Sequence, residues 1–288
     1  YQAGITGNGN TNGKVAANDG SAAGSSSLQL FNRQAWGGLS GSFGEVRFGL
    51  QDSVPFQTFV NLDYNGASNG VSAAVYTGAG LWASSRQGHS LQYISPSLGG
   101  LTVQVGYVMG GSQDYADGAS FKDGDDPDDR TTWTGADDKD TKNVASAGLT
   151  YVIGSATLAA AYQGSGKDDD AGTSDFDESA AYFGFGAQYD FGTFKVKADY
   201  QKQDTKSGVN LGAVTTVAGW SVGAQYSVGT DESKTVYSDN VKTSGYELFV
   251  NKEVLKNVYG YAEIGSGKTD QDGAETNTGF AVGMILVF

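Results

Sequence analysis

The chain has 288 residues, a formal net charge of −14, no Cys and one His. The lack of Cys excludes disulfides and thiolate metal sites, and a single His cannot form a His cluster around a metal. The 44 Gly, 16 Tyr and 14 Phe are unusual for a soluble globular protein. Glycine fills no core and aromatic side chains need burial or an interface, which a membrane β-barrel with aromatic girdles and a polar lumen provides.

Stretches in which apolar and polar residues alternate follow one another along the chain. In chain order, the clearest are 43–51, 86–95, 101–107, 157–163, 183–189, 194–201, 220–228 and 280–288. In one of them, Phe194, Val196 and Ala198 are separated by charged residues. A period of two indicates β-strands, and about ten residues suffice for a tilted strand to cross a bilayer. The pattern predicts an all-β protein with about thirteen recognisable strands.

The predicted connections alternate between short and long. Short ones include 40–42, 95–99, 154–155 and 190–193, and long ones are 6–27, 52–86, 110–142, 166–177, 205–215 and 268–276. Bacterial outer-membrane barrels combine short periplasmic turns with long extracellular loops. The sequence therefore predicts a transmembrane antiparallel up-and-down β-barrel, forming a single domain over residues 1–288.

Much of the negative charge lies in two predicted loops, 110–142 and 167–178. The simplest interpretation is solvated loops that repel one another. Alternatives are an acidic vestibule that concentrates cations at the channel mouth and a Ca²⁺ site at 123–130. The Asp spacing of 123–130 matches no defined calcium loop, and no other cofactor is expected.

Three stretches resemble the trimeric general porins of Gram-negative bacteria, most closely the β-proteobacterial branch. Residues 31–49, FNRQAWGGLSGSFGEVRFG, look like the family's hairpin before the constriction loop. Residues 86–101, RQGHSLQYISPSLGGL, look like the strand that leaves this loop, followed by a turn. The third stretch is the C-terminal strand from Phe280 to Phe288, whose terminal aromatic is part of the assembly signal in that family.

The resemblance implies a sixteen-stranded barrel in the complete protein, assembled as a homotrimer in the bacterial outer membrane. Its partners would be outer-membrane lipid, lipopolysaccharide, small hydrophilic solutes and ions, with no nucleic acid. A loop folded into the channel corresponds to 52–86. The family has three strands before the hairpin at 28–51. Either the first strands are missing here, or residues 1–5 complete a fourteen-stranded barrel.

The candidate site is the narrowest cross-section of the channel. Alternation directs Glu45 and Arg47 into the lumen, as it does Arg86, Ser90 and Gln92. Arg47, Arg86 and Arg33 match constriction positions of the family, although Arg33 needs a β-bulge to face inward. Asp52 and Asp63 are the acids of the predicted loop and would oppose the arginines. Further residues expected to line the lumen are Lys195, Lys197, Asp199, Glu247 and Glu263.

Permanently charged arginines opposite acids would produce a transverse electric field across the channel, and polar solutes can align in that field. The simpler alternative is that Arg47 and Arg86 form ion pairs with nearby carboxylates. Other functions stay open at this point. They are a substrate-specific channel, a secreted β-rich adhesin or binding protein, and a membrane enzyme using His89, which alternation turns away from the lumen. We expect a diffusion channel and no enzyme.

Overall fold

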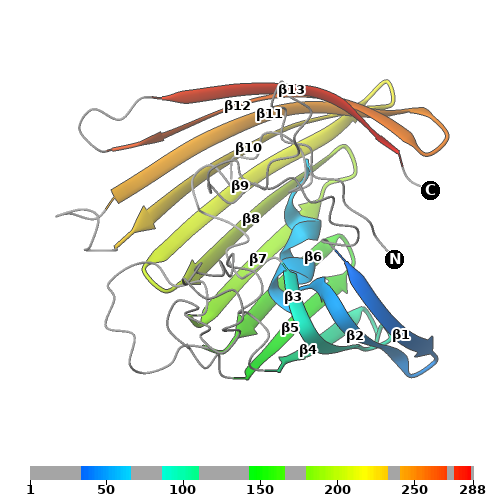
Figure 1. Cartoon of the computed structure of the whole chain (residues 1–288). Helices are drawn as coiled ribbons and strands as arrows, with labels where there is room; N and C mark the ends of the chain where they lie inside the picture. The colour runs from blue at the N-terminus through cyan, green and yellow to red at the C-terminus, as the bar shows by residue number, and fades with distance from the viewer. Residues whose placement is uncertain are drawn as a thin grey trace, which may run out of the picture.

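The computed structural model describes residues 34–65, 86–109, 143–165, 180–232, 241–270 and 276–286. They form thirteen strands in one antiparallel sheet, in which each strand pairs with the next along the chain (Figure 1). The strands are β1 Ala35–Gly41, β2 Gly44–Asp52, β3 Arg86–Ile94, β4 Leu101–Val108, β5 Val144–Ile153, β6 Ala156–Gln163, β7 Tyr182–Asp190, β8 Phe194–Gln203, β9 Lys206–Val217, β10 Trp220–Asp231, β11 Val241–Leu255, β12 Val258–Thr269 and β13 Asn277–Leu286.

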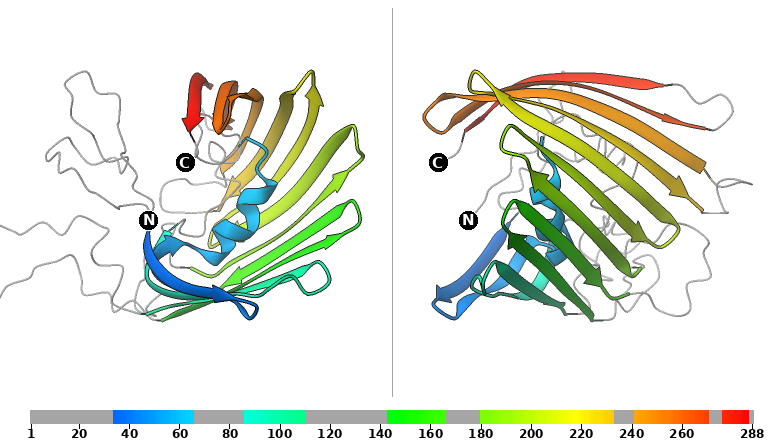
Figure 2. Two further views of the ribbon diagram at one scale, coloured as in Figure 1. Left: turned by 90° about the vertical axis from the view of Figure 1, so that its right-hand side faces the viewer. Right: turned by 180° about the vertical axis from the view of Figure 1, so that it is seen from behind.

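The sheet curls strongly, so that it has a concave and a convex face (Figure 2). Among the described strands, β1 and β13 are the two edges and do not pair with each other. The predicted up-and-down antiparallel topology and the number of recognisable strands are confirmed. No helix in the described part of the chain is long and apolar enough to span a membrane.

The two faces of the sheet have opposite polarity. On the concave face, polar side chains such as Gln203, Ser227 and Glu247 are almost completely buried. On the convex face, apolar side chains such as Phe185 and Leu211 are exposed, with 58% and 47% of their surface accessible. A soluble protein buries apolar groups and exposes polar ones. The inverted distribution fits a wall with hydrocarbon outside and a polar interior.

Most connections confirm the predicted asymmetry, but one does not. Segment 205–215 was expected to be a long loop, and the structure instead places it in β9 after the two-residue turn Asp204–Thr205. Asp204 takes up the positive φ of 50° that this tight turn needs. The Gly and Asn residues of the segment suggested a loop, yet Gly208 and Asn210 occupy inward positions between outward apolar residues.

A short helical segment follows β2 and lies inside the curve of the sheet (Figure 2). It consists of α1, Val54–Phe59, and the 3₁₀ turn η1, Val60–Leu62. Ser53 caps α1, because its Oγ accepts a hydrogen bond from the Phe56 amide at 3.2 Å. The buried residues Phe59, Leu62, Ala159, Ala161 and Tyr182 form the apolar contact between this segment and the concave wall.

Glycines on the concave wall leave the space that the helical segment occupies. A Cβ built on Gly106 or Gly148 would lie 2.9 Å from a methyl group of Val54, and one on Gly184 would lie 2.9 Å from the ring of Phe59. Because real Cβ atoms do not approach so closely, a larger residue at these positions would push the segment away from the wall. The small residues of β4 to β7 therefore fix where α1 lies.

Candidate functional site: the lumen and the segment that crosses it

The helical segment is anchored where it leaves β2. The side-chain amide of Gln57 donates to the carbonyl of Asp52 at 2.6 Å and to the side chain of Gln92 at 2.7 Å. Gln92 in turn donates to the Asp52 carbonyl at 2.8 Å. Gln92, predicted to line the lumen, is 2% exposed and holds the start of the segment.

The other end of the segment reaches the opposite wall. Asp63 accepts a hydrogen bond from Gln225 of β10 at 2.7 Å, and the amide of Tyr64 lies 3.4 Å from the same side chain. The side-chain amide of Asn65 donates to both Glu247 of β11 and Glu263 of β12. Residues 53–65 thus cross the concave space from β2 to β12.

The wall next to the segment carries a compact charged group. Arg47 and Glu45 form a two-pronged ion pair, with Nε to Oε1 at 2.8 Å and Nη2 to Oε2 at 2.9 Å. The Arg47 guanidinium also lies over the Trp36 ring of β1, 4.5 Å from its centroid. Both members of the pair are only about a quarter exposed, with side-chain accessibilities of 22% and 28%. The pair uses two of the donors in the rigid guanidinium fork of Arg47.

Arg86 lies opposite Asp52 in the register of β2 and β3, with Nε 3.8 Å from Oδ1. Asp52 also accepts a hydrogen bond from Gln34 at 2.6 Å. Strict alternation does not hold here, because the register of β2 and β3 shifts between Gly49 and Gln51, and His89 has a positive φ of 44°. Consequently Gln87 is buried and donates to Gln163 of β6 at 2.9 Å.

A further polar group lies on β8 and β9. Lys197 and Asp199, 6% and 5% exposed, lie 3.6 Å apart, and Asp199 accepts hydrogen bonds from Gln201 and Asn210 at 2.8 Å and 2.7 Å. Lys197 is 5.9 Å from the centroid of the Tyr64 ring. Burial, and after it the charge of Asp190, raises the pKa of Tyr64 well above its usual value, so this phenol stays neutral.

Lys195 lies at the start of β8, directly after the short turn that connects β7 to β8, and its side chain is about half exposed. Its ammonium is 3.4 Å from Asp190 of β7. Of the remaining predicted positions, Arg33, Phe288 and the acidic loop 123–130 lie outside the described residues. The structure therefore brings Asp63, Lys197, Asp199, Glu247 and Glu263 together around the end of the segment, and Glu45, Arg47, Asp52 and Arg86 around its start.

Some lumen residues gave no signal in the sequence. Asn65 and Gln225 are uncharged and far apart in the chain. The contacts of Asn65 with Glu247 and of Gln225 with Tyr64 depend on how far the segment reaches across the sheet. Strict alternation would place the Gln87 side chain outward. It turns inward only because of the bulge. Its glutamine side chain between Arg86 and Gly88 was the one hint of a polar surrounding.

The chain matches the family model described as Gram-negative porin over residues 3–280. The chain belongs to this family. No curated protein is similar enough in sequence to count as a match. Three findings agree: the family, the strand topology and the inverted polarity of the wall. This porin is therefore an outer-membrane β-barrel that forms a channel for the passive diffusion of solutes.

Solved structures with the same fold are outer-membrane porins of low sequence identity. The anion-selective porin from Comamonas acidovorans is 20% identical, with a TM-score of 0.64 over 90% of this chain and 79% of that one. Salmonella typhi OmpF, solved in a complex with daunomycin, is 15% identical, with a TM-score of 0.64 over 88% and 77% of the two chains. A loop-deletion mutant of Vibrio cholerae OmpT is 17% identical, with a TM-score of 0.59 over 91% and 81%.

Proposed function

We propose that residues 53–65 form the constriction of this porin and that the channel prefers cations. The observation that carries the proposal is the crossing of the concave space from the Asp52 carbonyl to Glu247 and Glu263. A segment that crosses a channel narrows it, and the side chains beside it then set the size and charge of the solutes that pass. Arg47, Arg86, Asp52, Asp63 and Glu45 would line this passage.

The charge balance of the described lumen supports a preference for cations. Five bases of the described residues lie within 4.0 Å of a carboxylate, in the pairs Arg47–Glu45, Arg86–Asp52, Lys195–Asp190, Lys197–Asp199 and Lys206–Asp231. Asp63, Glu247 and Glu263 lie at the far end of the segment, where Asp63 accepts a hydrogen bond from Gln225 and the two glutamates accept from Asn65. Acidic side chains around a pore favour cations, and the net charge of −14 acts in the same direction.

Reconstitution in a planar bilayer tests this proposal. A tenfold KCl gradient across the membrane is expected to give a reversal potential of the sign that marks K⁺ as the more permeant ion. Neutralising both acids in a Glu247→Gln, Glu263→Gln variant is expected to move that potential toward zero. A preference for anions, like that of the anion-selective porin from Comamonas acidovorans, would contradict the proposal.

The resemblance of the sequence to trimeric porins adds two further proposals. The protein would assemble as a homotrimer, so that channels insert and open in groups of three in bilayer recordings. It would act as a channel for ions and small hydrophilic solutes without catalysing a reaction. A cross-linking experiment in mild detergent that yields only single subunits would rule out the trimer.

A further inference from the structure

Trp36 is an uncharged lumen residue at the start of the crossing segment, next to the charged groups of β2 and β3. It lies on β1 and is the one residue of that strand that is not exposed. Its cross-strand partner on β2 is Gly49, and a Cβ built on Gly49 would lie 3.2 Å from the Trp36 Cβ. The glycine therefore leaves the space that the base of the Trp36 side chain occupies.

One face of the Trp36 ring contacts Arg47. The guanidinium carbon of Arg47 is 4.5 Å from the ring centroid. Arg47 lies directly opposite Gly38 in the register of β1 and β2, so Trp36 is its diagonal neighbour, within reach of a long side chain. A cation over an aromatic face is attracted by the quadrupole of the ring. The Trp36 ring and the two hydrogen bonds to Glu45 thus hold the guanidinium from two sides.

The edge of the same ring starts a chain of polar contacts. The indole Nε1 of Trp36 donates to Oε1 of Gln34 at 3.1 Å, and Nε2 of Gln34 donates to Oδ2 of Asp52 at 2.6 Å. The other carboxylate oxygen of Asp52 is 3.8 Å from Nε of Arg86. Trp36 therefore touches the Arg47–Glu45 pair directly and reaches the Asp52–Arg86 pair through one side chain.

The chemistry of its two neighbours fixes the orientation of the Gln34 amide. An indole N–H can only donate a hydrogen bond, and an ionised carboxylate can only accept one. Between them the amide has one favourable orientation, with its oxygen toward Trp36 and its nitrogen toward Asp52. The opposite orientation would place the amide oxygen against the Asp52 carboxylate. The indole donor therefore keeps a hydrogen bond on Asp52.

We propose that Trp36 is a selectivity-determining residue of this channel, because it positions charges of both ion pairs without carrying a charge itself. The inference rests on the proposed function, in which these pairs line the passage. A hydrogen bond donated to a carboxylate offsets part of its charge, and a carboxylate that loses this bond acts more strongly on a passing cation. The N–H of Trp36 thus limits the effect of Asp52, and its ring limits the movement of Arg47.

Reversal potentials of the full-length protein in a tenfold KCl gradient test the link through Gln34. Trp36→Phe keeps an aromatic ring but has no N–H, and Gln34→Leu removes the amide. Each is expected to raise the permeability ratio of K⁺ to Cl⁻ about twofold, which is less than the roughly fourfold effect of a whole charge. Because both variants break the same chain of contacts, the double variant should also give about a twofold change.

Two results would overturn this link. A change of about fourfold in the double variant would show that the two side chains act independently. Unchanged ratios in both single variants would show that Trp36 does not determine selectivity. If Trp36→Phe lowers the yield of folded protein, Gln34→Leu still tests the hydrogen bond to Asp52 with the ring intact.

Single-channel recordings at constant voltage test the contact between the ring and Arg47. Trp36→Leu removes the ring, so Arg47 loses one of its two supports and the open-channel current is expected to fluctuate between levels. Trp36→Phe keeps a ring face for the guanidinium and should give a steady current. A steady current from Trp36→Leu as well would overturn the role of the ring.

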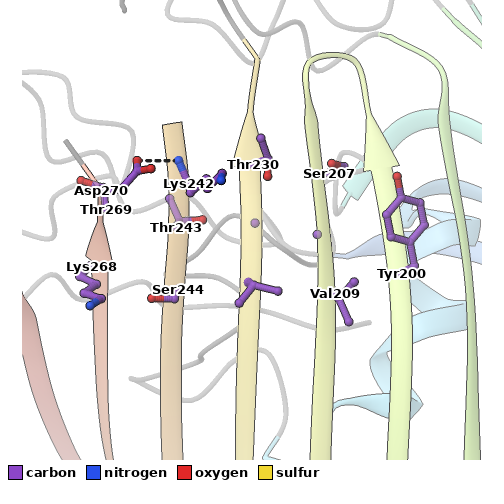
Figure 3. Close-up of a pocket in the computed structure, with 13 residues that line it drawn as sticks. Tyr200, Ser207, Val209, Thr230, Lys242, Thr243, Ser244, Lys268, Thr269 and Asp270 are labelled. Atoms are coloured by element: carbon purple, nitrogen blue, oxygen red, sulfur yellow. Dashed lines mark hydrogen bonds between the residues drawn. The ribbon is translucent and has the colours of Figure 1, made fainter. Parts of the chain in front are cut away.

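The convex face supplies matched controls. Trp220 is 40% exposed on that face and has Nζ of Lys252 5.3 Å from its ring centroid, so it repeats the pairing of ring and base outside the lumen. Trp220→Phe and Trp220→Leu should leave the permeability ratio and the current unchanged. Lys268 lines a shallow hollow on the convex wall (Figure 3), and Lys268→Gln removes a whole charge there without changing the ratio.

A shift from Trp220→Phe equal to that from Trp36→Phe would overturn the inference, because the effect would then not depend on the lumen. An anion-selective wild-type channel would contradict the proposed function. The comparison of the Trp36→Phe and Gln34→Leu single variants with their double variant tests the role of Trp36 in either case.

Discussion

The side chains of Arg47 and Glu45 meet in a two-pronged ion pair, in which Nε and Nη2 of Arg47 lie 2.8 Å and 2.9 Å from the two carboxylate oxygens of Glu45. They are two positions apart on β2, so both face the concave side of the sheet. The wall beside the start of the crossing segment is therefore nearly neutral as a whole. Removing one partner leaves the charge of the other to act on passing ions.

Glu45→Gln and Arg47→Ala are expected to shift the ion preference in opposite directions. Glu45→Gln leaves the Arg47 charge in place and should favour anions, whereas Arg47→Ala leaves a carboxylate and should favour cations. A unit charge about 5 Å from an ion in water changes its energy by roughly 0.8 kcal/mol, which corresponds to about a fourfold change in permeability ratio. Reversal potentials in a KCl gradient measure both shifts.

Lys252→Ala is the control for this pair, because it removes a charge from the outward-facing side of β11. Its reversal potential should equal that of wild type. Shifts of the same sign for Glu45→Gln and Arg47→Ala would show that the two residues act through the shape of the channel and not through their charge.

Asn65→Leu is expected to loosen the end of the crossing segment. The amide of Asn65 donates to both Glu247 and Glu263, and Asn65 is only 5% exposed. Leucine cannot donate, so two buried carboxylates lose a shared partner at a cost of roughly 2–4 kcal/mol. We expect the single-channel current to fluctuate between levels, which recordings at constant voltage would detect.

Asn61→Leu is the matched control for Asn65→Leu, since Asn61 lies on the exposed side of η1. It should give a current as steady as that of wild type. A steady current from Asn65→Leu as well would mean that the contacts of Asp63 with Gln225 and of Phe59 with the wall hold the segment without the Asn65 contact.

The strands could be predicted from the sequence because a membrane barrel repeats one physical constraint. Every second residue faces hydrocarbon, so runs such as Phe194, Val196 and Ala198 recur at a period of two. The same rule places Lys197 and Asp199 in the lumen, and the structure buries both. Segment 205–215 was misjudged because its inward positions carry Gly and Asn, residue types that also mark loops.

Contacts inside the lumen could not be predicted in the same way. The bulge at His89 changes which residues of β3 face inward, and a bulge depends on local backbone conformation rather than on polarity. The contact of Asn65 with Glu247 joins residues 182 positions apart, so it requires the path of the segment across the sheet. Alternation gives the direction of each side chain along a strand, but it does not give distances across the lumen.

Gly148→Leu is expected to displace α1 from the wall. A Cβ at Gly148 would lie 2.9 Å from a methyl group of Val54, and the packed interface leaves no room for a leucine side chain. Overpacking of this kind costs about 1–3 kcal/mol. We expect an altered conductance and a lower temperature of unfolding. Ala147→Leu, at the neighbouring exposed position on the lipid-facing side, should change neither.

The polarity of the wall itself can be tested on one strand. Leu211 is near the middle of β9 and faces outward with 47% of its surface exposed, whereas Val217 faces the same way at the end of the strand. An arginine in the middle of the bilayer costs about 2–4 kcal/mol and one near the interface about 0–1 kcal/mol. Leu211→Arg should therefore lower the free energy of unfolding in lipid vesicles by the larger amount, and Val217→Arg by the smaller. Equal effects of the two substitutions, measured by urea titration of the folded fraction, would mean that β9 does not cross hydrocarbon, and the membrane orientation of the sheet would then be wrong.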